Sequence, residues 1–461
     1  MGESSSSKTW AKGYLRLLGT AIPLILGTGY LAILEFIDRV MLSWYSKDAV
    51  AAVTPASVSS LALISFFMGI SVYVGTFVAQ YLGAGLKGKI GPFFWHGVYL
   101  SVLGGVLVLP FALLSPSIFA VIGHAPQIQA LEAEYFHIIC LGAVFPIMNA
   151  FLMSFFSSIG RLGVVVVSIL AAVVVNITLG YALIFGKLGA PEMGVAGSAI
   201  STVCASTVSL AIYAVYLLLG TVKKEYDLAR SARLDLRLLA SILRYGVPNG
   251  IQFFLDVIGF TVFLLIVGRI GVNELAASNI VLNINNIAFM PMFGIGMAIS
   301  ILVAERIGAR DHAGVKVIVN QGLVIGLAYV GTIAAIYFFG PGVLIQPFTL
   351  GHGVIQDPSV LDHTKSILAL VALYSLFDAV GIVVSNAIKG AGDTRFVMVT
   401  NLIGTVFVLI MPTFILVEVF EVGVFSAWVV FTATVIVMCA VFCLRYLSGR
   451  WKTVTLVNRL V

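Results

Sequence analysis

Long apolar runs follow one another along almost the whole chain, and the segments between them are short and carry most of the charges. Each run is long enough for a helix that crosses a bilayer, which needs about 20 mainly apolar residues. Several runs are longer, so tilt, kinks or extension beyond the membrane must accommodate the excess. Twelve such runs can be delimited, at residues 14–43, 49–83, 94–123, 128–158, 162–187, 193–221, 239–269, 275–308, 315–347, 363–390, 394–418 and 421–447. The pattern predicts an all-α integral membrane protein with twelve transmembrane helices.

A segment near the start of the chain recurs 225 residues later without a gap. Residues 23–84 and 248–309 share ten identities, and proline and glycine are among them. Both residue types have specific effects on the backbone, so their agreement carries more weight than a match between aliphatic residues. A duplicated apolar chain is typical of a transporter that is built from two related bundles, with its binding site between or within them.

The long polar segment from Lys223 to Arg237 separates six predicted helices from six. We therefore expect an N-terminal six-helix lobe at residues 1–222, a cytoplasmic linker at 223–238 and a C-terminal six-helix lobe at 239–461. Because each half has an even number of helices, both halves enter the membrane in the same direction. Two pseudo-symmetric six-helix bundles, related by an axis along the membrane normal, are then expected.

The basic residues indicate an orientation. If the N-terminus is cytoplasmic, 21 of the 26 Lys and Arg residues, Lys389 among them, fall on the cytoplasmic side. The other five are Arg39, Lys47, Lys187, Arg269 and Lys365. Cytoplasmic loops of membrane proteins carry this excess of positive charge, so we expect both termini in the cytoplasm and a location in the cell (plasma) membrane. The net charge of +6 then reflects topology, and no nucleic-acid partner is expected.

Pro23 and Pro248 occupy the same place in the two repeats, inside the first helix of each half. Proline removes a backbone hydrogen bond and bends a helix at that point. The bend is either a static kink that packing requires or a hinge that moves during transport.

Carboxylates inside the apolar runs need an explanation, because a charged side chain at the bilayer centre costs about 2.5–3.5 kcal/mol. Glu305 and Glu418 lie near span ends, where lipid headgroups can contact them, and Glu35 has Arg39 one turn later. Three acids have no basic residue three or four positions away: Asp38, Asp256 and Asp378. Such an aspartate can exchange a proton or hold a cation such as Na+. It can also be a protonated structural residue that is hydrogen-bonded to a neighbouring helix.

Neutral polar residues also lie inside the spans. Asn176 interrupts an aliphatic run, Thr202 follows in the next span, and Gln252 precedes Asp256. Asn279, Asn283 and Asn286 share one stripe of the eighth span. This stripe either faces a cavity or forms interhelical hydrogen bonds.

The motifs of an ATP-driven pump or an enzyme are missing from the sequence. It contains no nucleotide-binding glycine loop with Lys-Ser/Thr and no paired histidines for zinc, and its four cysteines lie inside predicted spans. We expect no enzyme activity, no catalytic residues and no cofactor or metal site, so transport would use an ion gradient.

Three motifs resemble those of the multidrug and toxic compound extrusion (MATE) family, and most closely its NorM-type branch. The first is Pro23 followed by Phe36-Ile37-Asp38-Arg39-Val40-Met41. The second is Val78-Ala79-Gln80-Tyr81-Leu82-Gly83-Ala84-Gly85. The third is Lys389-Gly390-Ala391-Gly392-Asp393-Thr394-Arg395. The resemblance implies an antiporter that exports organic cations, drugs or other amphipathic small molecules by alternating access, in exchange for H+ or Na+.

The resemblance also implies roles for single residues. The first-helix acid of the family corresponds to Asp38, and its polar partners correspond to Asn176 and Thr202. The acids of the NorM-type branch correspond to Asp256, where glutamate is usual, and to Asp378. Some members carry a second acid four residues after Asn176, where this chain has Gly180. We expect these five matching residues to couple transport to the ion, and Gln252, Asn283 and Asn286 to line the substrate cavity.

Two other functions are compatible with twelve helices. A lipid-linked oligosaccharide flippase of the same superfamily should line its cavity with arginines, but few cationic residues lie inside the spans. A channel or receptor would not need three membrane acids and a duplicated, proline-kinked helix. An antiporter that acts as a monomer in the lipid bilayer is the first expectation, and the flippase is the alternative.

Overall fold

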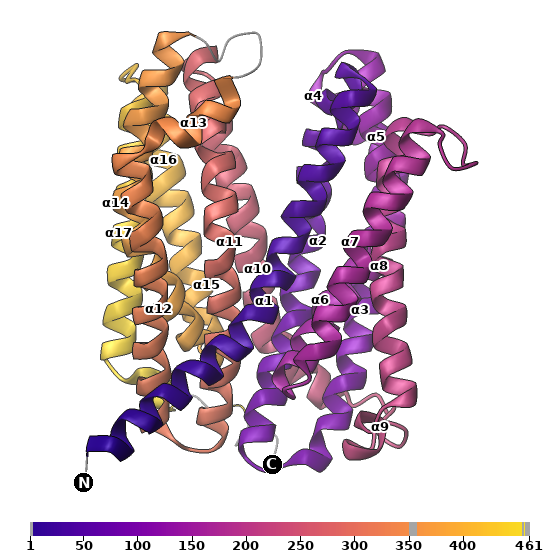
Figure 1. The fold of residues 1–461 in the computed structure, drawn as a ribbon, viewed down its shortest axis with the longest axis vertical. Helices are drawn as coiled ribbons and strands as arrows, with labels where there is room; N and C mark the ends of the chain where they lie inside the picture. Colours follow the sequence, from indigo (N-terminus) through magenta and orange to yellow (C-terminus); the bar gives the residue numbers. More distant parts are fainter. Residues whose placement is uncertain (1–2, 350–356, 454–455, 457–461) are drawn as a thin grey trace. The chain divides into compact units, whose positions relative to one another are not determined.

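The computed structural model describes residues 3–349, 357–453 and 456, and every regular element in these ranges is helical (Figure 1). η1 and η4 are 3-10 turns, and η3 is a π-helical segment. In chain order the elements are α1 (Glu3–Tyr45), α2 (Lys47–Gly83), η1 (Lys87–Lys89), α3 (Ile90–Leu113), α4 (Ser115–Ile122), α5 (Pro126–Leu141), α6 (Val144–Ser158), α7 (Leu162–Phe185), α8 (Gly194–Leu219), α9 (Val222–Glu225), α10 (Leu236–Val267), α11 (Val272–Gly308), α12 (His312–Phe339), α13 (Pro341–Thr349), α14 (Pro358–Ala391), α15 (Thr394–Ile403), η3 (Gly404–Ile410), α16 (Met411–Glu418), α17 (Val424–Leu447) and η4 (Arg450–Thr453).

The predicted all-α membrane fold is confirmed. Ten helical segments among the described residues are long and apolar enough to cross a membrane, namely α2, α3 with η1, α7, α8, α10, α11, α12, α14, the segment from α15 to α16, and α17. α5 and α6 meet the same test as one pair that is bent by 49°. Together with the 43-residue α1, they make the twelve membrane helices expected from the sequence.

Two of the predicted spans are shorter than the apolar runs that contain them. The run 94–123 breaks at Leu114, and α4 begins with Pro116 in its first turn. The run 315–347 breaks after α12, and α13 begins at Pro341. Proline is favoured in the first turn of a helix and disfavoured inside one, so each run is divided into a long membrane helix and a short helix.

Packing divides the chain into two compact units. Unit 1 contains Met1–Ile25, Leu255–Ile307 and Asp311–Thr455, and unit 2 contains Leu26–Phe254, Gly308–Arg310 and Leu456–Val461. The chain therefore changes unit inside α1, two residues after Pro23, and inside α10, six residues after Pro248. The first part of each of these helices packs with the unit that holds most of the other half of the chain.

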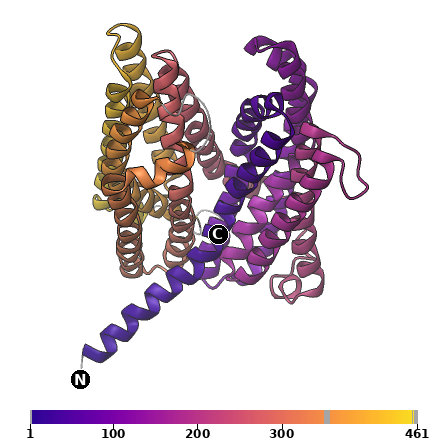
Figure 2. The same cartoon turned by 45° about the horizontal axis from the view of Figure 1, so that its top comes forward.

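The core of unit 2 is rich in aromatic side chains. Phe77, Phe93, Phe151 and Phe155 are buried among helices α2, α3 and α6. In both views α7 and α8 run side by side in this unit (Figures 1 and 2). The predicted linker belongs to the same unit, and its residue Leu228 is buried in the core while the Trp95 indole N–H donates to the Leu228 carbonyl at 2.7 Å.

Unit 1 has its own core around Trp428 of α17, which packs edge-on against Phe263 of α10. The Trp428 indole N–H donates to Ser278 Oγ of α11 at 3.0 Å. In this unit the span from α15 to α16 passes through the π-helical segment η3. Thr405 of η3 lies directly against Gly259, where a Cβ atom would collide with it. The glycine therefore lets α10 approach the π-helical segment.

The 225-residue repeat reappears as a repeated helix contact. A Cβ atom on Gly69 of α2 would lie 2.7 Å from the Gly250 Cα of α10, inside unit 2. A Cβ atom on Gly294 of α11 would lie 2.5 Å from the Ile25 Cα of α1, inside unit 1. Gly294 and Gly250 are the repeat equivalents of Gly69 and Ile25. Small residues allow this close approach of membrane helices.

Candidate functional site

Asp38 is the centre of a buried polar cluster in unit 2. It lies in the last two turns of α1 with 4% of its surface exposed, and its Oδ2 accepts a hydrogen bond from Thr202 Oγ1 at 2.9 Å. Asn176 Nδ2 donates to Thr202 Oγ1 at 3.2 Å. The structure thus brings together the three residues that the family resemblance assigned to one site.

The α7–α8 hairpin explains why Asn176 and Thr202 meet. Asn176 lies nine residues before the end of α7, and Thr202 lies eight residues after the start of α8. In an antiparallel pair these positions are at the same depth, about 13 Å from the turn at 1.5 Å per residue. A hydrogen bond from Met193 N to the Leu183 carbonyl at 2.7 Å closes the turn between the two helices.

The space next to Gly180 is filled by a neighbouring side chain. A Cβ atom on Gly180 would lie 2.8 Å from Met41 Cε and 3.4 Å from Ser201 Oγ. Relatives with an acid at this position would therefore place it beside the same polar cluster, and here a methionine occupies the place. Asn176 Oδ1 is buried without a hydrogen-bond partner among the described residues. A buried acceptor in this state is costly unless a cation, proton donor or water satisfies it.

A second charged cluster lies in unit 1. Asp256 of α10 is exposed and Asp378 of α14 is half-buried, and the two carboxylates are close enough to interact electrostatically. Asp256 also interacts with Lys389, which is buried in α14 with 7% of its surface exposed. Asp378 and Lys389 are eleven residues apart, which is three helical turns, so they lie on the same face of α14.

Lys389 is a buried basic residue whose neighbours the sequence did not reveal. The predicted span 363–390 contains it and α14 ends at Ala391, and it was counted with the cytoplasmic charges because it lies next to the end of that span. The spacing of eleven residues from Asp378 was the available signal. Lys389 interacts with Asp256 from another helix, so a search limited to residues three or four positions away in the sequence could not find this pair.

Asp378 lies beside a network of tyrosines. Tyr374, one turn earlier on α14, is buried, and its hydroxyl accepts a hydrogen bond from Asn285 Nδ2 at 3.4 Å. The Tyr337 hydroxyl of α12 donates to Asn285 Oδ1, also at 3.4 Å. The network orients polar groups from three helices towards the same part of unit 1, and sequence reasoning did not include the tyrosines.

The polar stripe on α11 is accessible. Asn279, Asn283 and Asn286 are exposed, and Asn283 Nδ2 donates to the Asn279 carbonyl at 2.8 Å within the same helix. Gln252 of α10 is half-buried, and its Oε1 atom is buried without a hydrogen-bond partner among the described residues. The hydrogen bond described for Asn283 stays within α11 and does not link two helices, as expected for a residue at a surface or a cavity.

The acids near span ends are paired with arginines. Glu305 accepts both of its hydrogen bonds from Arg16 at 2.6 Å, and Glu418 accepts one from Arg269 at 2.7 Å. A charged partner from another helix is thus added to the headgroup contact expected for each acid, because both carboxylates also stay partly exposed. The proposed pair of Glu35 with Arg39 involves a side chain outside those that the structure describes.

A further buried acid was missed in the sequence. Glu132 of α5 is fully buried and lies 2.7 Å from His124 Nδ1, while its Oε2 atom has no hydrogen-bond partner among the described residues. No cluster of three His, Cys, Asp or Glu residues that could hold a metal ion occurs in the described part of the chain.

Two halves of the chain match one family. The sequence model of the MatE family matches residues 23–182 and 248–415. The chain belongs to this family. The two matched segments begin at Pro23 and Pro248, which are 225 residues apart, the same offset as the internal repeat. MATE proteins are transporters, so the cluster around Asp38 and the cluster around Asp256 are parts of a transport protein.

Curated relatives extend over nearly the full length. The chain is 28% identical over 430 residues to a probable multidrug resistance protein NorM of Thermotoga maritima, covering 92% of this chain and 89% of the relative. It is also 28% identical over 383 residues to the protein of the same name from Shewanella oneidensis, with 82% of each chain covered.

Solved structures agree on the fold. An outward-facing multidrug resistance MATE transporter has a TM-score of 0.86 at 18% identity, with 96% of this chain and 97% of that chain covered. A MOP superfamily transporter from Pyrococcus furiosus has a TM-score of 0.85 at 19% identity, with the same coverage of both chains. The twelve-helix fold is therefore that of the MATE transporters.

Proposed function

We propose that this protein is a cation-coupled antiporter that exports organic cations, drugs or other amphipathic small molecules by alternating access, in exchange for H+ or Na+. The observation that carries the proposal is the presence of a separate carboxylate cluster in each unit. Asp38 is held by Thr202 in unit 2, and Asp256 and Asp378 lie together in unit 1. The multidrug resistance names of the NorM relatives support the same substrate class.

The charge of each cluster suggests how many cations it can take. The hydrogen bonds described for the Asp38 cluster join one carboxylate to the neutral side chains of Thr202 and Asn176, and these three groups carry a charge of −1 when the carboxylate is ionised. The unit 1 cluster contains two carboxylates and the Lys389 ammonium, and it also has a net charge of −1 when all are ionised. Each cluster can therefore be neutralised by one monovalent cation or proton, and burial favours this most strongly at Asp38, which is 4% exposed.

Exchange of one cation for another at such sites explains coupling. A site that can hold either the driving ion or the positive charge of the substrate releases one when it binds the other. Exchange of one proton for one monovalent cation moves no net charge. Exchange of two protons for one monovalent cation moves one net charge, and the membrane potential then adds about 2.3 kcal/mol per 100 mV to the driving force. Asn283 and Asn286 are proposed to line the substrate cavity, because both are exposed on α11. Gln252 is proposed as a further lining residue, because its buried Oε1 atom has no hydrogen-bond partner among the described residues.

Pro23 and Pro248 are proposed as hinges in this cycle. Each proline interrupts the hydrogen bonding of a helix shortly before the chain passes from one unit to the other. Pro23→Ala should slow turnover more than it weakens substrate binding. We also propose two lobes, at 1–222 and 239–461, joined by a linker at 223–238. This division follows the sequence repeat, whereas the packing units divide the chain inside α1 and α10.

Transport in proteoliposomes tests the function. Export of ethidium, a fluorescent organic cation, should follow an imposed H+ or Na+ gradient in the wild type and be lost in Asp38→Asn, Asp256→Asn and Asp378→Asn. Asp48→Asn, which changes an exposed acid at the start of α2, is the matched control. Uncoupled export in the wild type, or normal export by all three variants, would contradict the proposal.

The orientation needs a separate test. Both termini are proposed to be cytoplasmic in the plasma membrane, with the protein acting as a monomer. Cysteines introduced at the exposed positions Arg230 and Lys187 should be labelled from opposite sides of intact vesicles. Labelling of both from one side would refute this topology.

The flippase remains the second candidate. It would need several cationic side chains inside the membrane to bind a pyrophosphate. Lys389 is the basic residue that is buried among the described residues, and its interaction with Asp256 accounts for its charge. The structure therefore offers no specific support for the flippase.

A further inference from the structure

A groove of about 900 Å³ opens on unit 2 between the start of α7 and the end of α8. Its volume lies at the upper end of the range that small-molecule sites have, about 300–1,000 Å³. Apolar side chains and glycines form most of its walls. The lining residues are Gly160, Arg161, Leu162, Gly163, Val164, Val167, Val208, Ala211, Ile212, Val215, Tyr216, Leu219 and Gly220.

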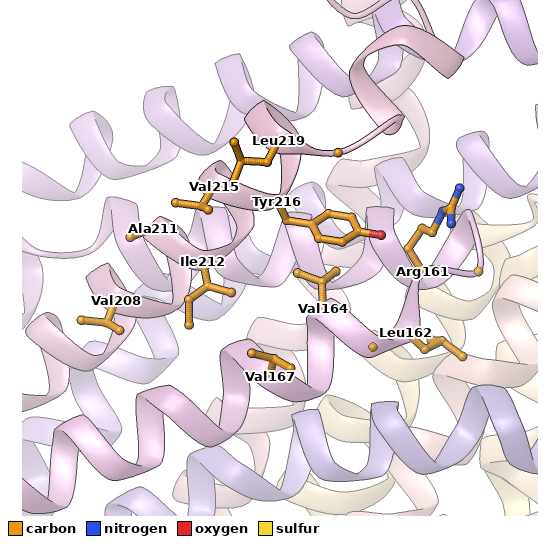
Figure 3. A pocket seen from close by; sticks show the side chains of 13 residues that line it. Arg161, Leu162, Val164, Val167, Val208, Ala211, Ile212, Val215, Tyr216 and Leu219 are labelled. Carbon is orange, nitrogen blue, oxygen red and sulfur yellow. The ribbon is translucent and has the colours of Figure 1, made fainter.

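The polar groups of the groove are gathered at one end. In Figure 3 the guanidinium of Arg161 and the hydroxyl of Tyr216 lie at this end, and Val208 lies at the other. The Tyr216 ring is held edge-on against Phe156 at 5.6 Å between ring centroids. The groove therefore has a cationic, hydrogen-bonding head and an apolar body.

The length of the groove matches one leaflet of a bilayer. Its lining on α8 runs from Val208 to Gly220, which is about 18 Å at 1.5 Å per residue. Half of the hydrocarbon core is about 15 Å thick. The polar head of the groove lies at the helix ends next to basic loops, where lipid headgroups are found, and the apolar body extends towards the middle of the membrane.

The charge of Arg161 selects between possible occupants. Arg161 Nη2 lies 3.2 Å from Glu225 Oε2, and Glu225 Oε1 lies 3.4 Å from Lys87 Nζ. Partial burial opposes the ionised form of Glu225, but the hydrogen bonds from Arg161 and Lys87 outweigh it, and the pKa of this carboxyl is lowered. Two cations and one anion leave a net charge of +1 at the head of the groove, which repels an organic cation and attracts an anionic headgroup.

The second half of the chain provides an internal comparison. Gly392 and Asp393 precede α15 as Gly160 and Arg161 precede α7, and both glycines have a positive φ. There Asp393 accepts two hydrogen bonds from Arg445 of α17, at 2.8 and 2.6 Å, and both side chains are largely buried. The position equivalent to Arg161 is thus an aspartate that is paired with an arginine in unit 1, whereas Arg161 in unit 2 is exposed at the groove.

We propose that the groove between α7 and α8 binds one anionic phospholipid, with its phosphate on Arg161 and Tyr216 and an acyl chain along the apolar walls. The guanidinium has five N–H donors in a planar fork, and contact with Glu225 leaves others for a phosphate. In the proposed orientation this lipid belongs to the cytoplasmic leaflet. The lipid is a structural ligand of the Asp38-bearing unit and is distinct from the transported substrate.

Native mass spectrometry of the full-length protein in detergent tests the charge selectivity. The wild type should bind dioleoyl phosphatidylglycerol about fivefold more tightly than dioleoyl phosphatidylcholine, since one basic residue contributes about 1 kcal/mol to binding an anionic lipid surface. Arg161→Gln should remove this preference. Lys224→Gln, which changes an exposed lysine at the same end outside the groove, should keep it. Equal binding of both lipids by the wild type, or an unchanged preference in Arg161→Gln, would overturn the proposal.

A matched pair of tryptophans tests the location. Ala211 and Ala214 are both exposed on α8, and only Ala211 lines the groove. Ala211→Trp should fill the groove and lower phosphatidylglycerol binding at least tenfold, while Ala214→Trp should bind as the wild type does. Equal binding by the two variants would place the lipid elsewhere. The melting temperatures of both variants should equal that of the wild type, which shows that the difference does not come from unfolding.

Two competition experiments separate the remaining occupants. Glycerol phosphate carries the headgroup chemistry without an acyl chain and should not displace the lipid at equal concentration. Ethidium should not displace it either, because the head of the groove is cationic. Displacement by glycerol phosphate would indicate a simple phosphate site, and displacement by ethidium would make the groove a substrate entrance. Either result would refute the lipid assignment.

Discussion

The close contact of Gly69 with Gly250 is open to a direct test. Gly69→Ala would place a methyl carbon 2.7 Å from the Gly250 Cα and 3.0 Å from the Asn249 carbonyl oxygen. These are backbone atoms, which cannot rotate away as a side chain can. Carbon atoms in favourable contact are about 3.5–4.0 Å apart, so α2 and α10 would have to separate by about 1 Å.

The cost can be worked from two contributions. Overpacking of this kind costs about 1–3 kcal/mol. Separation of the helices also weakens the hydrogen bond from Asn249 Nδ2 to the Gly69 carbonyl, which is 2.7 Å long and buried, and such a bond contributes about 0.5–1.5 kcal/mol. The sum is about 1.5–4.5 kcal/mol. Gly294→Ala should cost a similar amount, because its methyl carbon would lie 2.5 Å from the Ile25 Cα.

Thermal unfolding of the purified protein in detergent measures the effect. For a unit of about 200 residues, each kcal/mol shifts the melting temperature by about 2–4 °C, so about 1.5–4.5 kcal/mol corresponds to a melting temperature about 3–18 °C lower. Gly331→Ala is the control, because a Cβ atom at this helical position of α12 would meet nothing within 4 Å. It should leave the melting temperature unchanged or raise it, since alanine stabilises a helix by about 0.5–1 kcal/mol over glycine. If Gly69→Ala melts with or above Gly331→Ala, the helices are not in the contact described.

Three further predictions concern polar contacts. Thr202→Val should slow ion-driven export at least about tenfold, while Thr202→Ser should keep it. The reason is that the hydrogen bond from the Thr202 hydroxyl to Asp38, 2.9 Å long, contributes about 1.5–3 kcal/mol. Equal export by both variants would show that this bond is dispensable. Arg445→Gln should cost about 3 kcal/mol of unfolding free energy because it leaves Asp393 partly buried without its partner, and the double variant with Asp393→Asn should recover part of that loss in a melting experiment. Two backbone N–H groups at the start of α10 donate to Asp235 and lower the pKa of its carboxyl. The ionised carboxylate therefore stabilises the helix start fully above the unfolded pKa of about 3.9, and this stabilisation is lost as the pH falls through the folded pKa. Hydrogen-exchange protection factors in the first turn of α10 should fall below about pH 4 in the wild type, and an equal fall in Asp235→Asn would contradict this assignment.

A candidate residue could be found in the sequence when it is polar and lies inside a long apolar run, away from the predicted helix ends. Asp38 was identified because the motif around it is local, and Asn176 stands out because it interrupts an aliphatic run. Thr202 was assigned to the site with Asn176 by the family resemblance. Their meeting depends on the α7–α8 hairpin, which places two positions 26 residues apart at one depth. Asp256 and Asp378 were found for the same reason, since an acid in an apolar run stands out.

Residues whose role depends on a distant partner were not found in this way. Lys389 lies next to the end of its predicted span and was counted with the cytoplasmic charges, and only the packing of α14 shows that it is buried and interacts with Asp256. Glu305 and Glu418 were expected to contact lipid headgroups, and their arginine partners were not found because these are 289 and 149 residues away in the chain. Coulomb attraction acts through space, and no local pattern records it.

The sequence by itself determined that this is a twelve-helix membrane protein with a duplicated architecture, because hydrophobic length and repeated proline and glycine positions are properties of the chain alone. Which parts pack together was decided by the tertiary structure. The change of unit inside α1 and α10, the approach of Gly69 to Gly250 and the groove at Arg161 all depend on which helix surfaces are complementary. In lipid, apolar surfaces have no hydrophobic preference for one another, so close packing and hydrogen bonds between specific helices select the arrangement.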